Sequence, residues 1–352
     1  MTVDELIVGS QPPGSGERTD RDLAARAWRR VSRLWLVLGA GALLVAVAFQ
    51  LAPSLAGTPR TGVTLVVAGE SFLLVDVDTG RTTALSGAPD PSTVVTQGSR
   101  IIALQPQGPD DLAPPVLTLG PDQVEKLGGA DALVAGPTGG GVWLMLDAVG
   151  RYRGSATYFN ASGSWRTPIL PMPRRYSVVG AVPDGLLVMS GQDRDQRLSV
   201  YDPRNDLVIR RLGSVGTVLA AGGPIVTTTV MCWVTECPMY TVDTRTGVRS
   251  RIEPPTGTLF SGRPVPSPDG TQVAAVVRRL VDGSAALAVG TVRDGLRVVD
   301  DVRAQPGATV EWTTTGWVAV PNSPTLVTLW RGGQSREVAL PAGTRMVAVR
   351  SG

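Results

Sequence analysis

One stretch, residues 259–299, sets the pattern that constrains the fold most. It reads LFSGRPVPSPDG, TQVAAVV, RRLVDGS, AALAVGTVRDG and LRVV in sequence. Four short runs rich in Val, Ala and Leu, separated by Pro, Asp and Gly, predict four antiparallel strands joined by turns. We expect the chain to repeat this unit seven times after residue 62.

A first turn motif recurs before an apolar strand in six places. Each copy is a tight turn that contains glycine. The copies are Gln97-Gly98 before RIIAL, Pro137-Thr138-Gly139 before GVWLML, Pro183-Asp184-Gly185 before LLVMS, Gly222-Gly223-Pro224 before IVTTTV, Pro268-Asp269-Gly270 before TQVAAVV, and Thr315-Gly316 before WVAV.

A second turn motif follows the next strand each time and has the composition of a hairpin turn. Its copies are Asp78-Thr79-Gly80, Gly120-Pro121-Asp122, Ala161-Ser162-Gly163, Arg204-Asn205-Asp206, Arg245-Thr246-Gly247, Arg293-Asp294-Gly295 and Arg331-Gly332-Gly333. The two motifs alternate with a spacing of roughly 35 to 47 residues, the range of four-stranded propeller blades.

The segments SPDGTQVAAVV, VDVDTG and TVDTRTG resemble the blades of WD40-like and TolB-type β-propellers. Each motif is common in β-proteins, so the resemblance rests on their ordered alternation over nearly the whole region after Gly62. It implies an all-β fold, a seven-bladed β-propeller. A six- or eight-bladed ring, with the irregular unit 100–135 misassigned, and a pair of β-sandwiches are the alternatives.

The repeat also predicts how the ring closes. With strands a to d counted outward from the axis, the first motif joins a to b and the second joins c to d. The first strand, 64–68, is then a b strand without its a strand, and the last run, 345–350, has no b strand after it. We therefore expect the C-terminal strand to become the innermost strand of the first blade, which removes exposed sheet edges.

The N-terminal region has a different composition. We expect a disordered cytoplasmic tail over 1–19, a basic juxtamembrane helix over 20–33, a transmembrane helix over 34–52, a linker over 53–62 and the propeller over 63–352. Segment 34–52 has 19 residues without a charge. At about 1.5 Å per residue this length just crosses a hydrocarbon core of roughly 30 Å. The lipid bilayer is thus a predicted partner.

The charges beside this segment predict its orientation. Arg21, Arg26, Arg29, Arg30 and Arg33 precede it, and only Arg60 follows closely. The N-terminus should stay in the cytoplasm, and the C-terminal domain should be extracytoplasmic in a single-pass cell-membrane protein. A signal peptide cleaved near Ser54-Leu55-Ala56 is the alternative, although a 33-residue leader before the apolar run is long for one.

Composition removes several function classes. The sequence has no histidine, so it cannot form a Ser-His-Asp arrangement or a His-ligated metal site. Net charge is only +3, which indicates no basic face for nucleic acid. We predict no cofactor. The preference for Arg, Ala, Gly and Pro over Lys suggests a high-GC, actinobacterial genome.

Candidate binding residues fall on the connections from b to c and from d to a, which are longer and less regular than the tight turns. Variable loops on a rigid scaffold are where binding usually resides. The candidates are Asp110, Asp111, Arg151, Arg153, Arg174, Arg175, Asp193, Asp195, Trp233, Arg278 and Arg279. A solvated rim explains the charges more simply, and an anionic envelope polymer, calcium or a glycosidase-like pair of carboxylates are alternatives for them.

Cys232 and Cys237 flank WVTE between a b strand and a c strand. Outside the cytoplasm, two cysteines that close a short hairpin predict a structural disulfide. The redox alternative lacks the C-x-x-C spacing and a basic neighbour.

Two functions remain open. The first is a membrane-anchored propeller that binds an unknown envelope protein or polymer as a scaffold or sensor, with the arginine-rich cytosolic helix as a possible signalling end. The second is a propeller enzyme, a hydrolase or lyase, that acts on a cell-surface polymer through loop carboxylates.

Overall fold

The computed structural model describes most of the chain after residue 59. The described ranges are 60–69, 72–85, 91–97, 100–109, 111–119, 124–137, 141–146, 154–160, 167–191, 196–230, 237–344 and 346–351. The predicted tail, juxtamembrane helix and transmembrane helix, with most of the linker, lie outside them. Within those ranges no helix is long and apolar enough to cross a bilayer. Thr61–Gly352 form one compact unit.

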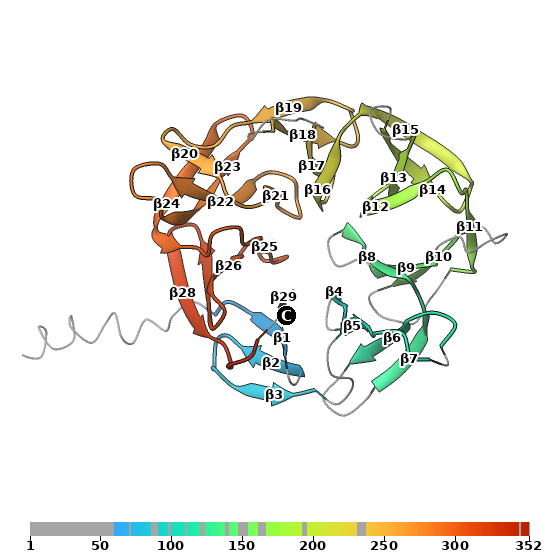
Figure 1. The fold of residues 1–352 in the computed structure, drawn as a ribbon, viewed down its shortest axis with the longest axis horizontal. Helices are drawn as coiled ribbons and strands as arrows, with labels where there is room; N and C mark the ends of the chain where they lie inside the picture. The colour runs from blue at the N-terminus through green and yellow to red at the C-terminus, as the bar shows by residue number, and fades with distance from the viewer. Residues whose placement is uncertain are drawn as a thin grey trace, which may run out of the picture. The chain divides into compact units, whose positions relative to one another are not determined.

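Seven antiparallel sheets surround a common axis in this unit (Figure 1). In the first three blades the strands run outward as β29 (Met346–Ser351), β1 (Val63–Ala68), β2 (Phe72–Asp76), β3 (Thr82–Ala84); β4 (Thr93–Gln97), β5 (Arg100–Leu104), β6 (Pro115–Leu119), β7 (Val124–Gly129); and β8 (Ala132–Ala135), β9 (Gly141–Leu146), β10 (Gly154–Asn160), β11 (Leu170–Met172).

The other four blades keep the same outward order. They are β12 (Ser177–Val182), β13 (Gly185–Ser190), β14 (Arg197–Asp202), β15 (Leu207–Ser214); β16 (Thr217–Gly222), β17 (Ile225–Thr229), β18 (Met239–Asp243), β19 (Arg249–Ile252); β20 (Thr258–Phe260) with β21 (Val265–Pro266), β22 (Val273–Arg279), β23 (Ala285–Thr291), β24 (Gly295–Arg303); and β25 (Glu311–Trp312), β26 (Val318–Ser323), β27 (Leu326–Arg331), β28 (Gln334–Ala339). The seven-bladed prediction is confirmed.

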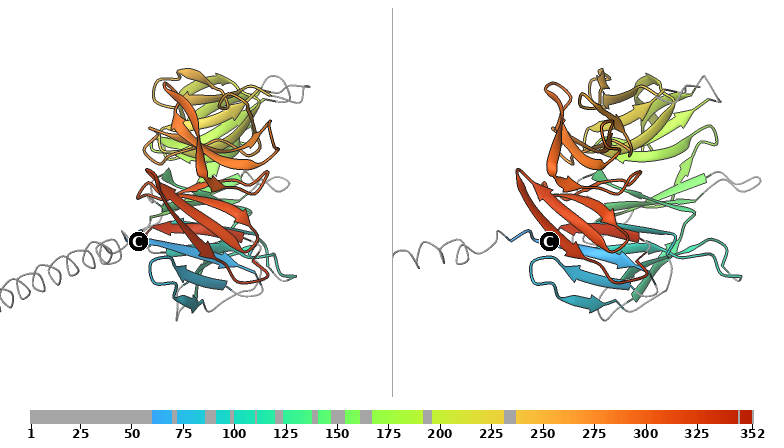
Figure 2. Two further views of the ribbon diagram at one scale, coloured as in Figure 1. Left: turned by 90° about the vertical axis from the view of Figure 1, so that its left-hand side faces the viewer. Right: turned by 60° about the vertical axis from the view of Figure 1, so that its left-hand side comes forward.

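The closing strand is also as predicted. β29 pairs antiparallel with β1, with Val63 opposite Ser351 and Ala68 opposite Met346. The last strand of the chain is therefore the innermost strand of the first blade. Figure 2, which includes an edge-on view of the ring, shows β29 ending at one face, beside the beginning of β1. This is the face that carries the a-to-b and c-to-d turns.

Apolar alternation explains why the blades stack. In β22, Ala274 and Val276 pack toward the seventh blade, whereas Val273 and Val277 pack toward the fifth. Alternate side chains of a strand point to opposite faces of its sheet, so a b strand that lies between two neighbours is apolar at nearly every position. The sequence VAAVV is the result.

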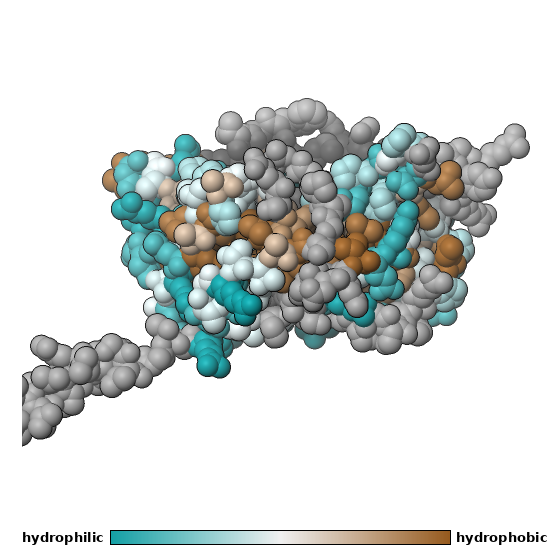
Figure 3. Space-filling model, turned by 90° about the horizontal axis from the view of Figure 1, so that it is seen from below, coloured by the Kyte–Doolittle hydropathy of each residue, from teal (hydrophilic) through white to brown (hydrophobic). Residues whose placement is uncertain are grey.

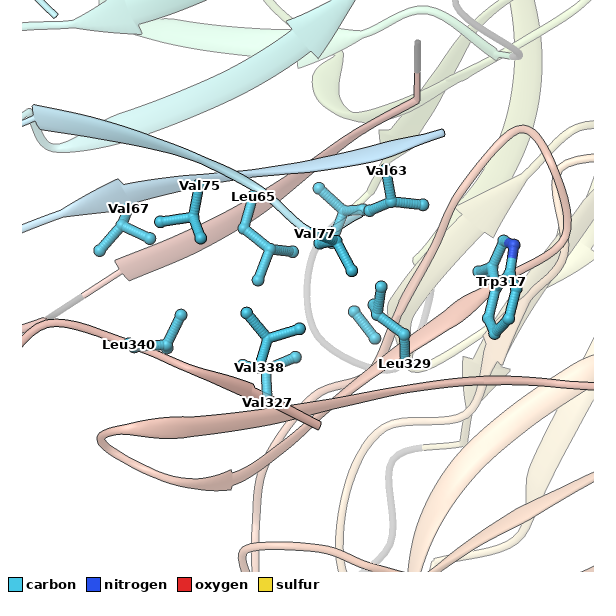
Figure 4. Close-up of a cluster of buried hydrophobic side chains, with 12 residues drawn as sticks. Val63, Leu65, Val67, Val75, Val77, Trp317, Val327, Leu329, Val338 and Leu340 are labelled. Atoms are coloured by element: carbon cyan, nitrogen blue, oxygen red, sulfur yellow. The ribbon is translucent and has the colours of Figure 1, made fainter. Parts of the chain in front are cut away.

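Seven apolar clusters fill the seven seams between neighbouring blades. The cluster between the seventh and first blades includes Val349 of β29. Leu65, Trp317 and Leu329 of the same cluster are labelled in Figure 4. Leu65 and Leu329 are fully buried, and each such side chain contributes about 1.5–3 kcal/mol. The side of the ring accordingly shows an apolar band at mid-height between more hydrophilic rims (Figure 3).

The innermost strand of the sixth blade departs from the regular pattern. It is divided into β20 and β21, because the N–H groups of Ser261 and Gly262 both donate to the carbonyl of Val276, at 2.9 and 3.0 Å. Two residues opposite one form a bulge. The sequence unit that revealed the repeat thus contains the least regular inner strand.

Candidate binding cavity and loop face

The described candidate residues lie in different blades and do not form one cluster. Asp111 lies between β5 and β6 in the second blade, Arg174 and Arg175 lie between β11 and β12, and Arg278 and Arg279 lie in the sixth blade. The two sixth-blade arginines are the last residues of β22 and not part of a loop, because β20 pairs with them and extends the strand.

Contacts within the propeller already engage several of these side chains. Lys126 Nζ lies 3.4 Å from Asp111 Oδ1, and the N–H of Gly108 donates to Asp111 Oδ2 at 3.3 Å. The guanidinium of Arg175 stacks 5.0 Å from the centre of the Tyr176 ring. Arg279 forms an ion pair with Asp300 at 2.5 Å. Solvated, locally paired charges are therefore the simplest account of the described candidates.

The remaining predicted residues lie outside the described ranges. They are Asp110, Arg151, Arg153, Asp193, Asp195, Trp233 and Cys232. The pairing of Cys232 with Cys237 and the roles of the loop carboxylates stay predictions. Among the described residues, no group of three or more acidic or cysteine side chains is arranged to hold a metal ion.

A cavity lies on the axis of the ring, between the innermost strands. It has a volume of about 850 Å³, and residues from the innermost strands of all seven blades line it. Its walls combine aliphatic side chains, Val134, Val178 and Val265 among them, with polar groups such as Thr96 and Gln97, and the lining extends to the a-to-b turns, such as Gly222-Gly223. The volume lies in the range of small-molecule sites, roughly 300–1,000 Å³.

Glu311, the first residue of β25, is the only charged residue among the described residues that line this cavity. Its Oε2 accepts a hydrogen bond of 3.2 Å from the N–H of Val349 in β29. Glu311 keeps partial contact with the cavity, but protein atoms crowd its carboxyl group. This burial raises the pKa of Glu311 to about 7, against the opposing effect of the Val349 hydrogen bond.

The closing strand is held at its inner edge from both sides. The hydroxyl of Thr96, in the second blade, donates to the carbonyl of Val349 at 2.7 Å, while Glu311, in the seventh blade, accepts from its N–H. Other inner strands are linked in the same way: Trp312 Nε1 donates to the carbonyl of Val265 at 2.9 Å. Side chains of neighbouring blades thus satisfy backbone groups that the sheets leave unpaired.

A second hollow of about 730 Å³ lies between the sixth and seventh blades on the tight-turn face. Trp312 and Thr314 line both this hollow and the axial cavity. Asp269 at its rim accepts hydrogen bonds from the Ser267 hydroxyl at 2.5 Å and the Thr271 N–H at 3.0 Å. These bonds lower the pKa of Asp269, so this carboxylate is engaged in its own turn.

Sequence reasoning missed Glu311. Only the ring places it beside the axis, although one signal was present in the residues themselves. The other innermost strands read TVVTQ, ALVA, SVVGAV, TVLAAG and VP, without charge, and MVAVRS with one arginine. A carboxylate at the first position of a strand, in a class of strands with no other acidic residue, was the detectable anomaly.

No protein-family model matches the sequence, and no curated protein matches it. Several solved structures match the chain in fold. The chain is similar to the β-propeller domain of the Trilobed protease from Pyrococcus furiosus, with 9% identity, a TM-score of 0.55, and coverage of 80% of this chain and 95% of that one.

It is also similar to an acylaminoacyl peptidase from Pyrococcus horikoshii, with 11% identity and a TM-score of 0.51 over 80% of this chain and 51% of that one. TolB from Acinetobacter baumannii matches with 13% identity and a TM-score of 0.43 over 88% of this chain and 70% of that one. Identities this low speak to architecture and not to activity. The chain is therefore, by fold, a seven-bladed β-propeller.

Proposed function

We propose that this protein is a binding module, a scaffold or sensor of the cell envelope that holds a ligand on the axis of its propeller. The observation that carries this proposal is the cavity of about 850 Å³ lined by all seven innermost strands. A closed ring fixes the walls of such a cavity, so binding requires little reordering of the protein.

The membrane part of the proposal rests on the sequence. Residues 34–52 anchor the chain, and the arginines before them keep the N-terminus in the cytoplasm. The beginning of β1 and the end of β29 lie on one face of the ring, and the longer connections, where an envelope partner would bind, lie on the opposite face. The enzyme alternative has no specific support in the described residues, since Asp111 is engaged by Lys126.

Site-specific photocrosslinking in intact cells tests the binding function. Ala221 is exposed and lines the cavity, and Ala339 is exposed on the outer strand β28. A photoreactive residue at 221 should give a crosslinked adduct, identified by mass spectrometry. The same residue at 339 should not.

Filling the cavity provides the control. Ala135 is also exposed and lines the cavity, so Ala135→Trp should suppress the adduct at 221 while Ala339→Trp leaves it unchanged. Equal yields of adduct from positions 221 and 339 would contradict binding on the axis. An adduct yield at 221 that Ala135→Trp does not change would also contradict it.

A further inference from the structure

The chemistry of the axial cavity restricts what it can hold. Its described lining carries one charged group, the Glu311 carboxyl, in walls that are otherwise apolar or neutral. A carboxyl in such surroundings costs free energy in its ionised form unless it is paired. A ligand of opposite charge would supply the missing partner.

The carboxyl is only partly engaged by the protein. Oε2 accepts the hydrogen bond from Val349. Oε1 makes no hydrogen bond within the part of the chain that the structure describes, and no described Lys or Arg lies within ion-pair distance of Glu311. Of the strands packed against β25, neither β21 nor β26 contains a titratable residue; β29 contains Arg350, whose side chain is outside the described set.

Aliphatic side chains share the lining with Glu311. Leu133, Val178 and Val265 come from three different blades and line the same cavity. A carboxylate and aliphatic side chains in one cavity together suit a cation that carries an apolar body.

We propose that the axial cavity binds an organic cation of the alkylammonium class, whose charged nitrogen pairs with Glu311 and whose aliphatic part lies against the aliphatic side chains of the lining. This inference rests on the proposed function, because it names the ligand class of the same cavity. It assigns Glu311 two contacts, one with the closing strand and one with the ligand.

Isothermal titration calorimetry on the full-length protein tests the pairing with two matched probes. n-Hexylamine is a cation at pH 8.5, whereas 1-hexanol is neutral and of nearly the same shape. We expect hexylammonium to bind at least tenfold more tightly than hexanol, because an ionised pair adds to the shared apolar contact. Equal affinities would overturn the proposal.

The Glu311→Gln variant separates the ligand role from a purely structural one. Glutamine keeps a carbonyl oxygen that can accept from the Val349 N–H, so the ring should stay closed, but it has no charge. In this variant the advantage of hexylammonium over hexanol should fall below twofold. The Asp111→Asn variant, on the loop-rich face, should keep the wild-type advantage of hexylammonium over hexanol. An unchanged advantage in Glu311→Gln would overturn the proposal.

Proton release gives a readout that a structural role would not produce. At pH 6 the Glu311 carboxyl is mostly protonated in the free protein, so binding of hexylammonium should release close to one proton. Titrations in buffers with different ionisation heats measure this release, which should vanish at pH 8.5 and in Glu311→Gln. If Ala135→Trp suppresses photocrosslinking at 221 while Glu311→Gln changes none of these readouts, the ligand class is wrong and the binding function stands.

Discussion

At the scale of single residues, two partly buried carboxylates have opposite environments. Glu311 bonds the closing strand β29, and Asp78 bonds the residues that precede β1. Glu311 has one hydrogen bond from the backbone and no charged partner among the described residues. Asp78, at the turn after β2, accepts from the N–H groups of Thr61 and Gly62 at 2.8 and 2.9 Å and from Arg336 Nη1 at 3.1 Å. Ionisation of Glu311 costs free energy, whereas the ionised form of Asp78 is stabilised by its partners.

The Glu311→Gln substitution should stabilise the protein at high pH. The pKa of Glu311 is raised from 4.5 to about 7 in the folded protein. The folded state therefore binds the proton more tightly than the unfolded state does. The wild type is most stable below the unfolded pKa and loses stability as the pH rises to about 7. Above that pH its free energy of unfolding stays at the lower value. The neutral glutamine avoids this loss, which amounts to about 1–3 kcal/mol in the free energy of unfolding.

Urea denaturation at pH 4 and pH 8.5 measures the effect. The variant should match the wild type at pH 4 and exceed it at pH 8.5. Glu337→Gln, on the exposed side of β28, serves as the control because its side chain is solvated. A variant that is no more stable than the wild type at pH 8.5 would contradict the burial of an unpaired charge.

The Asp78→Ala substitution should destabilise the protein. It leaves the N–H groups of Thr61 and Gly62 and the Arg336 guanidinium without their acceptor, at a cost of about 2–4 kcal/mol. Asp301→Ala, at an exposed position of β24, should change the free energy of unfolding little. Urea denaturation at pH 7 compares the two variants, and equal stabilities would contradict the role of Asp78.

The pH dependence of Asp78 has the opposite sign to that of Glu311. Burial alone would raise the pKa of Asp78, but the hydrogen bonds from Thr61 and Gly62 and the charge of Arg336 outweigh it and lower the pKa. Its stabilisation is thus complete above the unfolded pKa near 3.8 and is lost as the pH falls through the lower folded value. The wild type should lose more stability between pH 5 and 2 than Asp78→Asn does.

At the scale of elements, β29 completes a blade whose other three strands lie at the opposite end of the sequence. Ala348 faces the seam with the second blade, and Val349 faces the seam with the seventh. Deletion of residues 345–352 should therefore open two seams and leave β1 with an unpaired edge, so that the protein loses cooperative unfolding and associates.

Size-exclusion chromatography and urea denaturation check this outcome. A synthetic peptide of residues 345–352, added to the truncated protein, should restore a monomeric, cooperative species, because the strand pairs through β1 alone. A truncated protein that unfolds like the full-length chain would show that closure contributes little.

The elements also show how far sequence reasoning reaches. Turn motifs such as Asp243-Thr-Arg-Thr-Gly247 are local: the Asp243 carboxylate accepts from the Arg245 N–H at 2.8 Å, and Gly247 adopts φ 77°. Local signals of this kind predict the seven blades and the closing strand. The bulge between β20 and β21 and the cavity position of Glu311 depend on how distant strands meet, which the turn motifs do not encode.

At the scale of the whole molecule, the proposed membrane topology has a direct test. Alkaline phosphatase fused after Gly352 should be active in cells, because it requires an oxidising compartment to form its disulfides. The same enzyme fused after Thr19, or fused to a chain lacking residues 34–52, should be inactive. Activity of the fusion without residues 34–52 would contradict the anchor.

The pairing of Val63 with Ser351 also governs how the protein can be made. A chain grows from its N-terminus, so blades two to seven can assemble while synthesis proceeds. The first blade must wait, with three strands, until β29 leaves the ribosome. The earliest blade to be translated is thus finished only after the other six, and a nascent chain stalled before β29 would be the species most in need of a chaperone.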